Sequence, residues 1–307
     1  MAAAAAARRV FVLGGTGDQG RPLIAALRAR GHRVTAGVRD PASARAADLG
    51  VPLAAADIGD AGGMAAAMAG HDALALHLPF VHDVARAEAM ARAIAEAAQA
   101  AGIGRIVFNT SCFVADRDLG VAGHDGRRAI ERVFAGAGAA FVSLRPMVFM
   151  DNLTRPWARP AIVRDGVFAY PAAPALAISW IAIDDVAACM AAAVERDGLT
   201  DARIAIGGPE ALAGAETAIR LARALGRPVA FRSLPPETFA ADMSALVTGS
   251  REVRPASVYD GMARLYAWYN AQPSSPLACD PAAARDLMGR DPVDLESWAG
   301  RQHWRAD

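Results

Sequence analysis

Residues 10–20 read VFVLGGTGDQG, and this stretch decides the fold class. Its first four residues are all apolar, which is typical of a strand covered on both faces in a parallel sheet. A glycine-rich turn follows at once, and residues 21–30 then carry apolar side chains at helical spacing. A buried strand that enters a helix through such a turn is the structural context of a phosphate-binding fingerprint.

Strand and helix continue to alternate along the chain. Apolar runs predict further strands at 34–38, 53–56, 73–76, 106–108 and 141–144. Helical segments separate them, notably at 83–101 and 124–136. This alternation predicts an α/β protein with a Rossmann-type, doubly wound parallel sheet, whose first domain spans residues 8–150.

The pattern loosens after residue 146. Prolines scattered through residues 151–177 predict a long loop with short strands, and residues 181–186 indicate a strand end entering a helix capped by Asp184 or Asp185. A further strand is predicted at 202–206, and further helices at 214–225, 236–247, 257–270 and 280–288. We therefore expect residues 151–307 to form a smaller substrate-side lobe, interleaved with the first domain and contributing to the same sheet.

Composition argues against several classes of protein. The 307 residues include 32 basic and 32 acidic side chains, so no surplus of positive charge favours direct nucleic-acid binding. No apolar stretch of about 20 residues predicts a membrane span. Residues 1–7 predict a disordered tail, because the arginines follow the alanines, unlike in a signal peptide. Three scattered cysteines favour a reducing cytoplasm, and we expect neither a disulfide framework nor a metal site.

The glycine-rich turn has the spacing GxxGxxG. Gly14 would let the chain turn sharply, Gly17 would leave room for a pyrophosphate, and Gly20 would let the helix lie close to the strand. The phosphates would then meet unpaired N–H groups at a helix N-terminus. The alternative is a glycine-rich turn without a ligand. The candidate binding residues of this turn are Gly14, Thr16, Gly17, Asp18, Gln19 and Gly20.

The end of the second strand bears on the choice of nucleotide. An acidic residue there accepts hydrogen bonds from the ribose 2′-hydroxyl of NAD(H), whereas an arginine suits the 2′-phosphate of NADP(H). This chain has Arg39 at that place, after Gly37, which removes side-chain bulk. Arg39 therefore favours NADP(H) over NAD(H), although Asp40 could pair with it or cap the next helix.

The third strand ends at Asp57-Ile58. A carboxylate at this place could accept a hydrogen bond from the adenine amino group. Asp57 could instead cap the following helix, and Asp60 competes for that capping role.

Several segments together resemble the NmrA-like group of atypical short-chain dehydrogenases/reductases. The resemblance covers residues 8–225, and the group includes regulators that bind NADP without obvious turnover, quinone reductases and isoflavone-type reductases. The matching segments are residues 14–20, 31–40, 56–57, 104–111, 130–131, 144–152 and 206–210.

The resemblance also implies a path for the cofactor. Leu78 and Pro79, after the fourth strand, would line the passage from adenosine to nicotinamide. The nicotinamide would be surrounded by Thr110, Ser111, Pro146, Met147, Val148 and Phe149. These positions follow the carboxyl ends of strands, where open α/β sheets bind ligands.

The resemblance leaves the catalytic acid in question. Short-chain dehydrogenases typically use a serine with a tyrosine and lysine spaced YxxxK, but here Gly123 stands at the tyrosine position and Arg127 at the lysine position. Ser111 fits the serine position. Arg127 cannot act as a general acid, although it could bind the ribose or polarise a carbonyl. We therefore expect His124, or an ordered water, to protonate the substrate; the alternative is a surface histidine near a helix start.

Other residues carry alternative interpretations. Cys112 fits a small apolar role better than that of a nucleophile, because no base is evident beside it. One group of aromatic residues could line an apolar substrate pocket or form the core of the lobe: Trp157, Phe168, Tyr170 and Trp180. A second group lies on a late helix and could face the pocket or a partner subunit: Tyr266, Trp268 and Tyr269.

Two functions fit these observations. The first is an NADP(H)-dependent oxidoreductase that transfers hydride to a small apolar carbonyl, quinone or enone-like substrate, using a cofactor for the chemistry and the protein for orientation. The second is a non-catalytic NADP(H)-binding redox sensor that acts through a regulatory protein partner. The sequence leaves open the substrate and whether the chain forms a homodimer.

Overall fold

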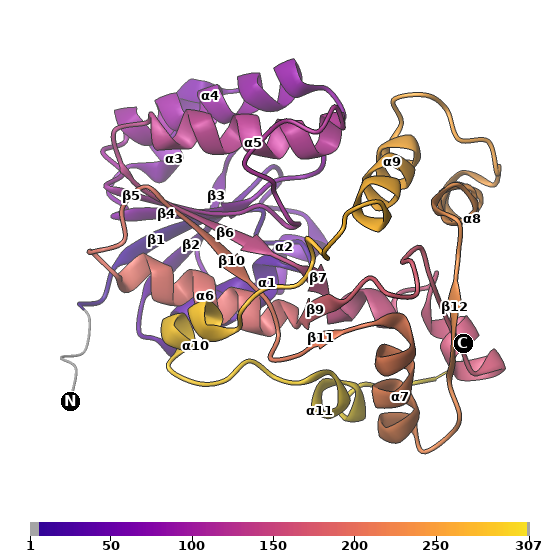
Figure 1. The fold of residues 1–307 in the computed structure, drawn as a ribbon. Helices are drawn as coiled ribbons and strands as arrows, with labels where there is room; N and C mark the ends of the chain where they lie inside the picture. The colour runs from indigo at the N-terminus through magenta and orange to yellow at the C-terminus, as the bar shows by residue number, and fades with distance from the viewer. Residues whose placement is uncertain (1–5, 306–307) are drawn as a thin grey trace.

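Strand β1 (Arg9–Leu13) lies inside a seven-stranded parallel sheet in the computed structural model, which describes residues 6–305 (Figure 1). Its side chains alternate between two cores. Val10 and Val12 pack on one face, and Phe11 and Leu13 pack on the other. This alternation explains why the strand is apolar throughout. Of the tail predicted over residues 1–7, residues 1–5 lie outside the described part.

The remaining strands of the sheet match the predicted runs closely. They are β2 (Arg33–Val38), β3 (Leu53–Ala55), β4 (Ala73–His77), β5 (Arg105–Asn109), β6 (Ala140–Pro146) and β10 (Ala202–Ile206). Their order across the sheet is β10-β6-β5-β4-β1-β2-β3, so the chain changes direction between β1 and β4. Open α/β sheets bind ligands beyond the carboxyl ends of their strands at such a switch point.

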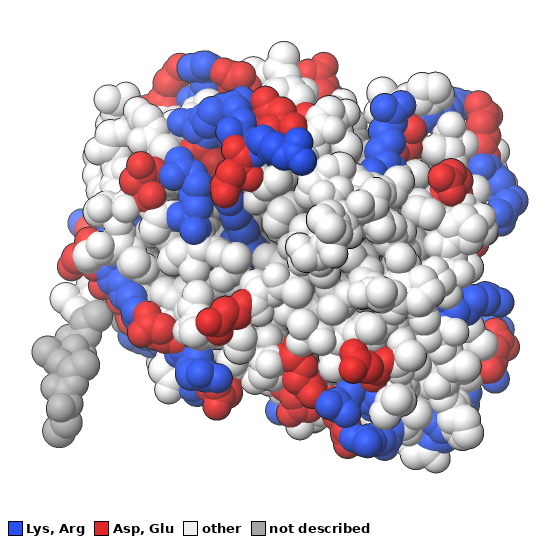
Figure 2. Space-filling model, viewed as in Figure 1, with Lys and Arg blue, Asp and Glu red and all other residues white. Residues whose placement is uncertain are grey.

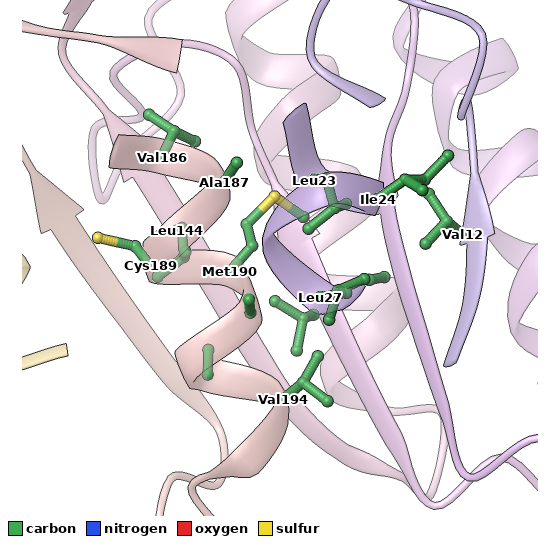
Figure 3. Packing of buried hydrophobic residues seen from close by; sticks show 14 of the residues in the cluster. Val12, Leu23, Ile24, Leu27, Leu144, Val186, Ala187, Cys189, Met190 and Val194 are labelled. Carbon is green, nitrogen blue, oxygen red and sulfur yellow. The ribbon is translucent and has the colours of Figure 1, made fainter. Parts of the chain in front are cut away.

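Helices cover both faces of this sheet (Figure 1). One face carries α1 (Gly20–Ala29) and α6 (Ile183–Glu195), and the other carries α3 (Ala61–Met68), α4 (Val84–Ala100) and α5 (Ala122–Ala135). Figure 3 shows Leu23 and Leu27 of α1 beside Met190 and Val194 of α6, and all four belong to the core on this face of the sheet. The doubly wound fold class is therefore confirmed.

Two local predictions differ in outcome. Gly31 has φ 84° and ends α1, as expected for a left-handed cap. The predicted cap of α6 is wrong, because Ala182 occupies the cap position and neither Asp184 nor Asp185 caps the helix. Asp185 is buried and instead accepts hydrogen bonds from the Arg290 guanidinium at 2.6 Å and from the Val293 N–H at 2.8 Å.

The chain after residue 146 builds small sheets and helices beside the carboxyl edge of the central sheet (Figure 1). Its strands are β7 (Val148–Phe149), β8 (Val167–Tyr170), β9 (Ile178–Ile181), β11 (Ala211–Leu212) and β12 (Ala230–Ser233). Its other helices are α7 (Gly214–Leu225), α8 (Pro236–Thr248), α9 (Val258–Asn270), α10 (Ala282–Met288) and α11 (Leu295–Gly300). The short helices α2 (Ala44–Ala47), Met150–Thr154 (3-10) and Ala161–Asp165 (π) complete the description.

The aromatic group on β8 and β9 forms the core of this lobe. Phe168, Tyr170 and Trp180 are each 1% exposed and contact one another edge to face or stacked, and Trp157 packs against them. Of the two alternatives for these residues, the structure supports the core.

The charged side chains are mixed rather than separated by sign. On the face seen in Figure 2, acidic and basic groups alternate over α5 and along the lower rim, with an uncharged area between α5 and α9. None of the helices within residues 6–305 combines the length and apolar character needed to cross a membrane.

Candidate functional site

A cavity of about 1030 Å³ opens beyond the carboxyl ends of β1, β2 and β4. It is called the larger cavity below. The predicted binding residues that line it are Gly14, Thr16, Gly17, Gln19, Arg39, Asp57, Ile58, Leu78, Pro79, Ser111 and Arg127. The fold thus brings together residues from five separate loops at the edge where the sheet changes direction.

The glycine-rich turn is built by close backbone contacts. Gly14 has φ 87°, and a Cβ at Gly20 would lie 2.2 Å from the Gly14 carbonyl oxygen. No other residue type could therefore occupy position 20 without moving the helix. Within the described residues, the N–H groups of Thr16, Asp18 and Gln19 donate no hydrogen bond. Three free donors at the start of α1 are suited to an anionic group.

The end of β2 offers positive charge to the same cavity. Arg39 is exposed, and none of the acidic side chains among residues 6–305 pairs with it. Arg86, on the first turn of α4, lines the cavity as well. Gly37 was expected to leave room for the nucleotide. The structure gives a different reason for the glycine: a Cβ at this position would lie 2.5 Å from the Phe11 ring.

Three acidic residues near the cavity accept hydrogen bonds from nearby backbone N–H groups. The Asp40 carboxylate accepts a hydrogen bond from the Ala42 N–H at 2.9 Å, so Asp40 caps the turn rather than pairing with Arg39. Asp60 caps α3 through the Gly63 N–H at 2.9 Å. Asp57 accepts from the Gly59 N–H at 2.9 Å and lines the cavity.

His77 forms part of the floor under the glycine-rich turn. A Cβ on Gly14 would lie 2.9 Å from its ring, and the ring also lines the larger cavity. Burial, followed by the charge of Arg127, lowers the pKa of His77 to about 4, so its imidazole is neutral near pH 7. Residues 6–305 contain no group of three or more His, Cys, Asp or Glu side chains placed to hold a metal ion.

Arg127 is the most unusual side chain of the cavity. It is 2% exposed, its Nη2 donates to the Leu78 carbonyl at 2.6 Å, and its guanidinium lies 4.2 Å from the centre of the Phe80 ring. Its Nε and Nη1 atoms have no partner among the described residues. Burial lowers the pKa of Arg127 to about 10, so the side chain remains charged at neutral pH. A buried cation with two free donors fits an oxygen-rich ligand.

A smaller cavity of about 320 Å³ adjoins the larger one. Gln19, Phe80 and Ser111 line both. At this junction the Gln19 side-chain oxygen accepts hydrogen bonds from the Asn109 amide at 2.8 Å and from the Ser111 hydroxyl at 3.1 Å. Ser111, which lines both cavities, adopts φ 61°, an uncommon conformation for a residue with a side chain.

The lining of the smaller cavity is mostly apolar and aromatic. Met147, Val148 and Phe149 belong to it, as the resemblance implied. Tyr266 and Tyr269 of α9 also line it, which answers the question of where these two side chains face. Residues of this cavity that the sequence did not single out are Phe80, Phe113, Asn152, Met262, Leu265 and Leu277.

His124 lies elsewhere than expected. It lines neither cavity and is fully buried, so the surface alternative is also wrong. Its Nε2 accepts the Ala115 N–H at 2.8 Å, and its Nδ1 lies 2.9 Å from the Asp125 carboxylate, to which it donates. Burial lowers its pKa. With both ring nitrogens bonded, His124 holds the loop before α5 and has no proton to offer a substrate.

Four more predicted binding residues lie outside both linings. Asp18 forms an ion pair with Arg155 at 2.7 Å, and Gly20 packs behind the turn against Gly14. The buried Thr110 hydroxyl hydrogen-bonds to the Cys112 carbonyl at 2.6 Å. Pro146 ends β6 in the sheet. Gly20, Thr110 and Pro146 therefore support the site from behind, whereas Asp18 offers only its backbone N–H to a ligand.

Four further lining residues of the larger cavity share one face of α4. Arg86, Ala89, Met90 and Ala93 follow helical spacing on one face of α4, directly after the loop that contains Leu78 and Pro79. A helix that starts beside a binding loop turns one face toward the ligand.

Comparison with known proteins adds the following findings. A model of the NmrA-like family matches residues 6–296. An NAD(P)H azoreductase from Xenophilus azovorans is 31% identical over 260 residues, which cover 84% of this chain and 86% of the relative. A (4-alkanoyl-5-oxo-2,5-dihydrofuran-3-yl)methyl phosphate reductase from Streptomyces griseus is 31% identical over 230 residues, or 73% and 77% of the two chains.

Among solved structures, an NADPH-dependent quinone oxidoreductase from Escherichia coli complexed with NADPH shares the fold. The TM-score is 0.77 at 24% sequence identity, over 94% of this chain and 98% of the other.

Proposed function

The chain belongs to the NmrA-like family, and on that premise we propose that it is an NADP(H)-dependent reductase of small apolar carbonyl, quinone or enone-like substrates. One observation carries the proposal: a cavity suited to a dinucleotide meets an apolar cavity at Gln19, Phe80 and Ser111. A cofactor in the first would present its reactive end to a substrate in the second. The similarity to an NAD(P)H azoreductase and a second reductase supports this class of reaction.

The residues present fit a dinucleotide with an extra phosphate. The free N–H groups of the glycine-rich turn would bind the pyrophosphate. Arg39 and Arg86 would hold the 2′-phosphate, and Asp57 would accept a hydrogen bond from the adenine. Arg127 would use its two free donors on the ribose beside the nicotinamide. The bound cofactor would supply the hydride.

The protein's own contribution is orientation and exclusion of water. Gln19 is fixed by Asn109 and Ser111, so the junction between the cavities is rigid before any ligand arrives. The charge of Arg127 lies beside this junction and would stabilise negative charge that develops on the substrate. The apolar lining of the smaller cavity keeps these electrostatic interactions strong.

Consumption of NADPH tests this function. Purified protein is mixed with NADPH or NADH and a panel of quinones, azo dyes, enones and aldehydes, and cofactor absorbance is followed. We expect turnover with at least one class and a higher kcat/KM for NADPH than for NADH. Absence of turnover across the panel would refute the proposal.

The preference for NADPH over NADH is tested by separate substitutions. Arg39→Ala should raise the KM for NADPH by roughly tenfold or more and leave that for NADH within about twofold, because only NADPH carries the 2′-phosphate. Arg33→Ala is the matched control, since Arg33 is also exposed but lies at the opposite end of β2. An equal change for both nucleotides would argue against this assignment of Arg39.

A redox sensor remains the second candidate, favoured by the glycine at position 123 where short-chain dehydrogenases carry their tyrosine. A sensor would bind NADP⁺ and NADPH with unequal affinity and consume neither. Titration of both forms, followed by fluorescence or calorimetry in the same preparation, separates it from the reductase.

A further inference from the structure

The start of α5 is crowded at Gly123, the position where short-chain dehydrogenases carry their tyrosine. A Cβ at Gly123 would lie 3.1 Å from the His82 ring, and a Cβ at Gly261 of α9 would lie 3.0 Å from the same ring. His82 is thus wedged between the two helices. Because α5 holds no tyrosine, the candidate proton donors are found among the side chains that line the smaller cavity.

The smaller cavity contains four side chains with an O–H or S–H group: Ser111, Cys112, Tyr266 and Tyr269. Ser111 donates its hydrogen to Gln19 at 3.1 Å. The Tyr266 hydroxyl is hydrogen-bonded to the Tyr170 hydroxyl at 2.6 Å, inside the lobe core. Each of these two hydroxyls therefore already has a hydrogen-bond partner within the protein.

Tyr269 differs from both. Only 3% of the residue is exposed, yet its hydroxyl has no hydrogen-bond partner anywhere in residues 6–305. Its ring is fixed by edge-to-face contacts with Phe113, Tyr266 and Trp268, at centroid distances of 5.9, 5.6 and 5.8 Å. A hydroxyl without a partner in the protein, on a ring that lines the cavity and cannot turn freely, is prepared for a ligand.

We propose that Tyr269 is the proton donor of the smaller cavity and supplies its phenolic proton to the substrate atom that becomes negative during reduction. This inference rests on the proposed reductase function. Hydride adds with its electron pair to one atom of the C=O, C=C–C=O or N=N group, and the π electrons move to the far atom. That atom takes the proton from the Tyr269 O–H, and the tyrosinate regains a proton from water after the product leaves.

The surroundings of Tyr269 keep it protonated. Burial raises the pKa of Tyr269 well above its usual value of 10, and the titratable groups that face it, Cys112 and Tyr266, act in the same direction. Burial likewise raises the pKa of the Cys112 thiol to about 11. Neither group is charged near neutral pH, so proton donation by Tyr269 should not limit turnover between about pH 6 and pH 9.

The test compares Tyr269→Phe with Tyr259→Phe, a matched change on the same helix outside both cavities. Phenylalanine keeps the ring contacts, and thermal unfolding verifies that both variants fold. The first readout needs no turnover: 4-nitrophenol is bound in the presence of NADP⁺ and titrated by its absorbance. A hydrogen bond from Tyr269 stabilises the bound phenolate, so Tyr269→Phe should raise the probe's pKa by about one unit.

The second readout is steady-state kinetics. Tyr269→Phe should lower kcat by roughly 100-fold with the KM for NADPH within about twofold, whereas Tyr259→Phe should match the wild type. An unchanged probe titration together with unchanged kcat would overturn the role of Tyr269. Failure of the reductase proposal would give a different result from failure of the Tyr269 proposal. The wild type itself would then not consume NADPH, while the probe titration would still report the hydrogen bond from Tyr269.

Discussion

Arg127 is charged, buried and only partly hydrogen-bonded, and such an arrangement costs stability in the absence of a ligand. Arg127→Met keeps the length and apolar contact of the side chain but removes the charge. We expect the variant to be more stable than the wild type without nucleotide, by about 1–2 kcal/mol in the free energy of unfolding. We also expect NADPH to bind it roughly 10- to 100-fold more weakly, since charged hydrogen bonds are lost.

Urea denaturation and nucleotide titration measure these two quantities on the same preparation. Arg127→Lys is the control, because it retains a buried cation and should recover part of the affinity. A variant that is both less stable and unaltered in NADPH binding would assign Arg127 a structural role only.

His77 makes stability depend on pH. Its pKa of about 4 in the folded protein lies below the ordinary 6.5, so between these values the unfolded chain holds a proton that the folded protein lacks. The free energy of unfolding therefore falls as pH falls from 6.5 to 4, by up to roughly 3 kcal/mol from this residue.

The measurement is urea denaturation of wild type and His77→Gln at several values between pH 7.5 and pH 4. The variant should lose less stability over that window, because one titrating group is gone. Burial lowers the pKa of His32, His82 and His124 too, so the variant retains part of the slope. Parallel curves for the two proteins would contradict the assignment.

The role of a single residue was predictable from sequence where neighbouring residues determine it, and not where residues distant in the chain do. Gly14 and Gly31 have the positive φ that a turn and a helix cap require. Gly37 is required for a reason that its own segment does not reveal, since the space beside it is filled by Phe11 from another strand rather than kept for a ligand. His124 was predicted to donate a proton because it lies next to position 123, where the tyrosine of the motif is missing. Its hydrogen bonds with Ala115 and Asp125 show a structural role that sequence spacing does not reveal.

At the scale of elements, the junction of β1 and α1 depends on two glycines in different ways. A Cβ at Gly20 would lie 2.2 Å from a backbone oxygen, whereas a Cβ at Gly17 would reach only ordinary contact, 3.4 Å from the His77 ring. Gly20→Ala should therefore displace α1 and lower the free energy of unfolding by about 3 kcal/mol.

Gly17→Ala is the matched control. It should leave stability within about 1 kcal/mol but weaken NADPH binding, because the added methyl group enters the larger cavity. Thermal unfolding and NADPH titration on both variants give the comparison. Equal loss of stability in the two would refute the distinction between a packing glycine and a ligand-facing glycine.

The elements were predictable because their patterns repeat locally, whereas the lining of the smaller cavity is assembled over long distances. Strands of the central sheet and helices such as 214–225 coincide with their predicted ranges. Phe113, Asn152 and Tyr269 come from three unconnected segments, and no spacing in the sequence links them. Likewise, α5 is joined to β6 by a buried ion pair, Glu131 with Arg145 at 2.8 Å, between two motifs that the resemblance matched separately.

At the scale of the whole molecule, the core under the sheet is built from both ends of the chain. It combines α1 and β1 with α6 (Figure 3) and also with β10 and α10, so residues after 150 cover one face of the sheet that residues 8–150 mainly build. Asp185 ties α6 to Arg290 and Val293 near the C-terminus. We infer that residues 8–150 do not fold alone, because their apolar face and the edge of β6 would be exposed.

The distribution of tryptophan makes this testable. All five tryptophans lie after residue 150, so their fluorescence reports the later part of the chain, while far-UV circular dichroism reports all helices and strands. If the two parts unfold together, urea curves from the two probes coincide with one midpoint. Separate midpoints, or a protease-resistant fragment 8–150, would show two independent units. Adding NADPH at about 100 times its Kd should shift both curves together, by about 2.7 kcal/mol, because a ligand bound to one cooperative unit stabilises all of it.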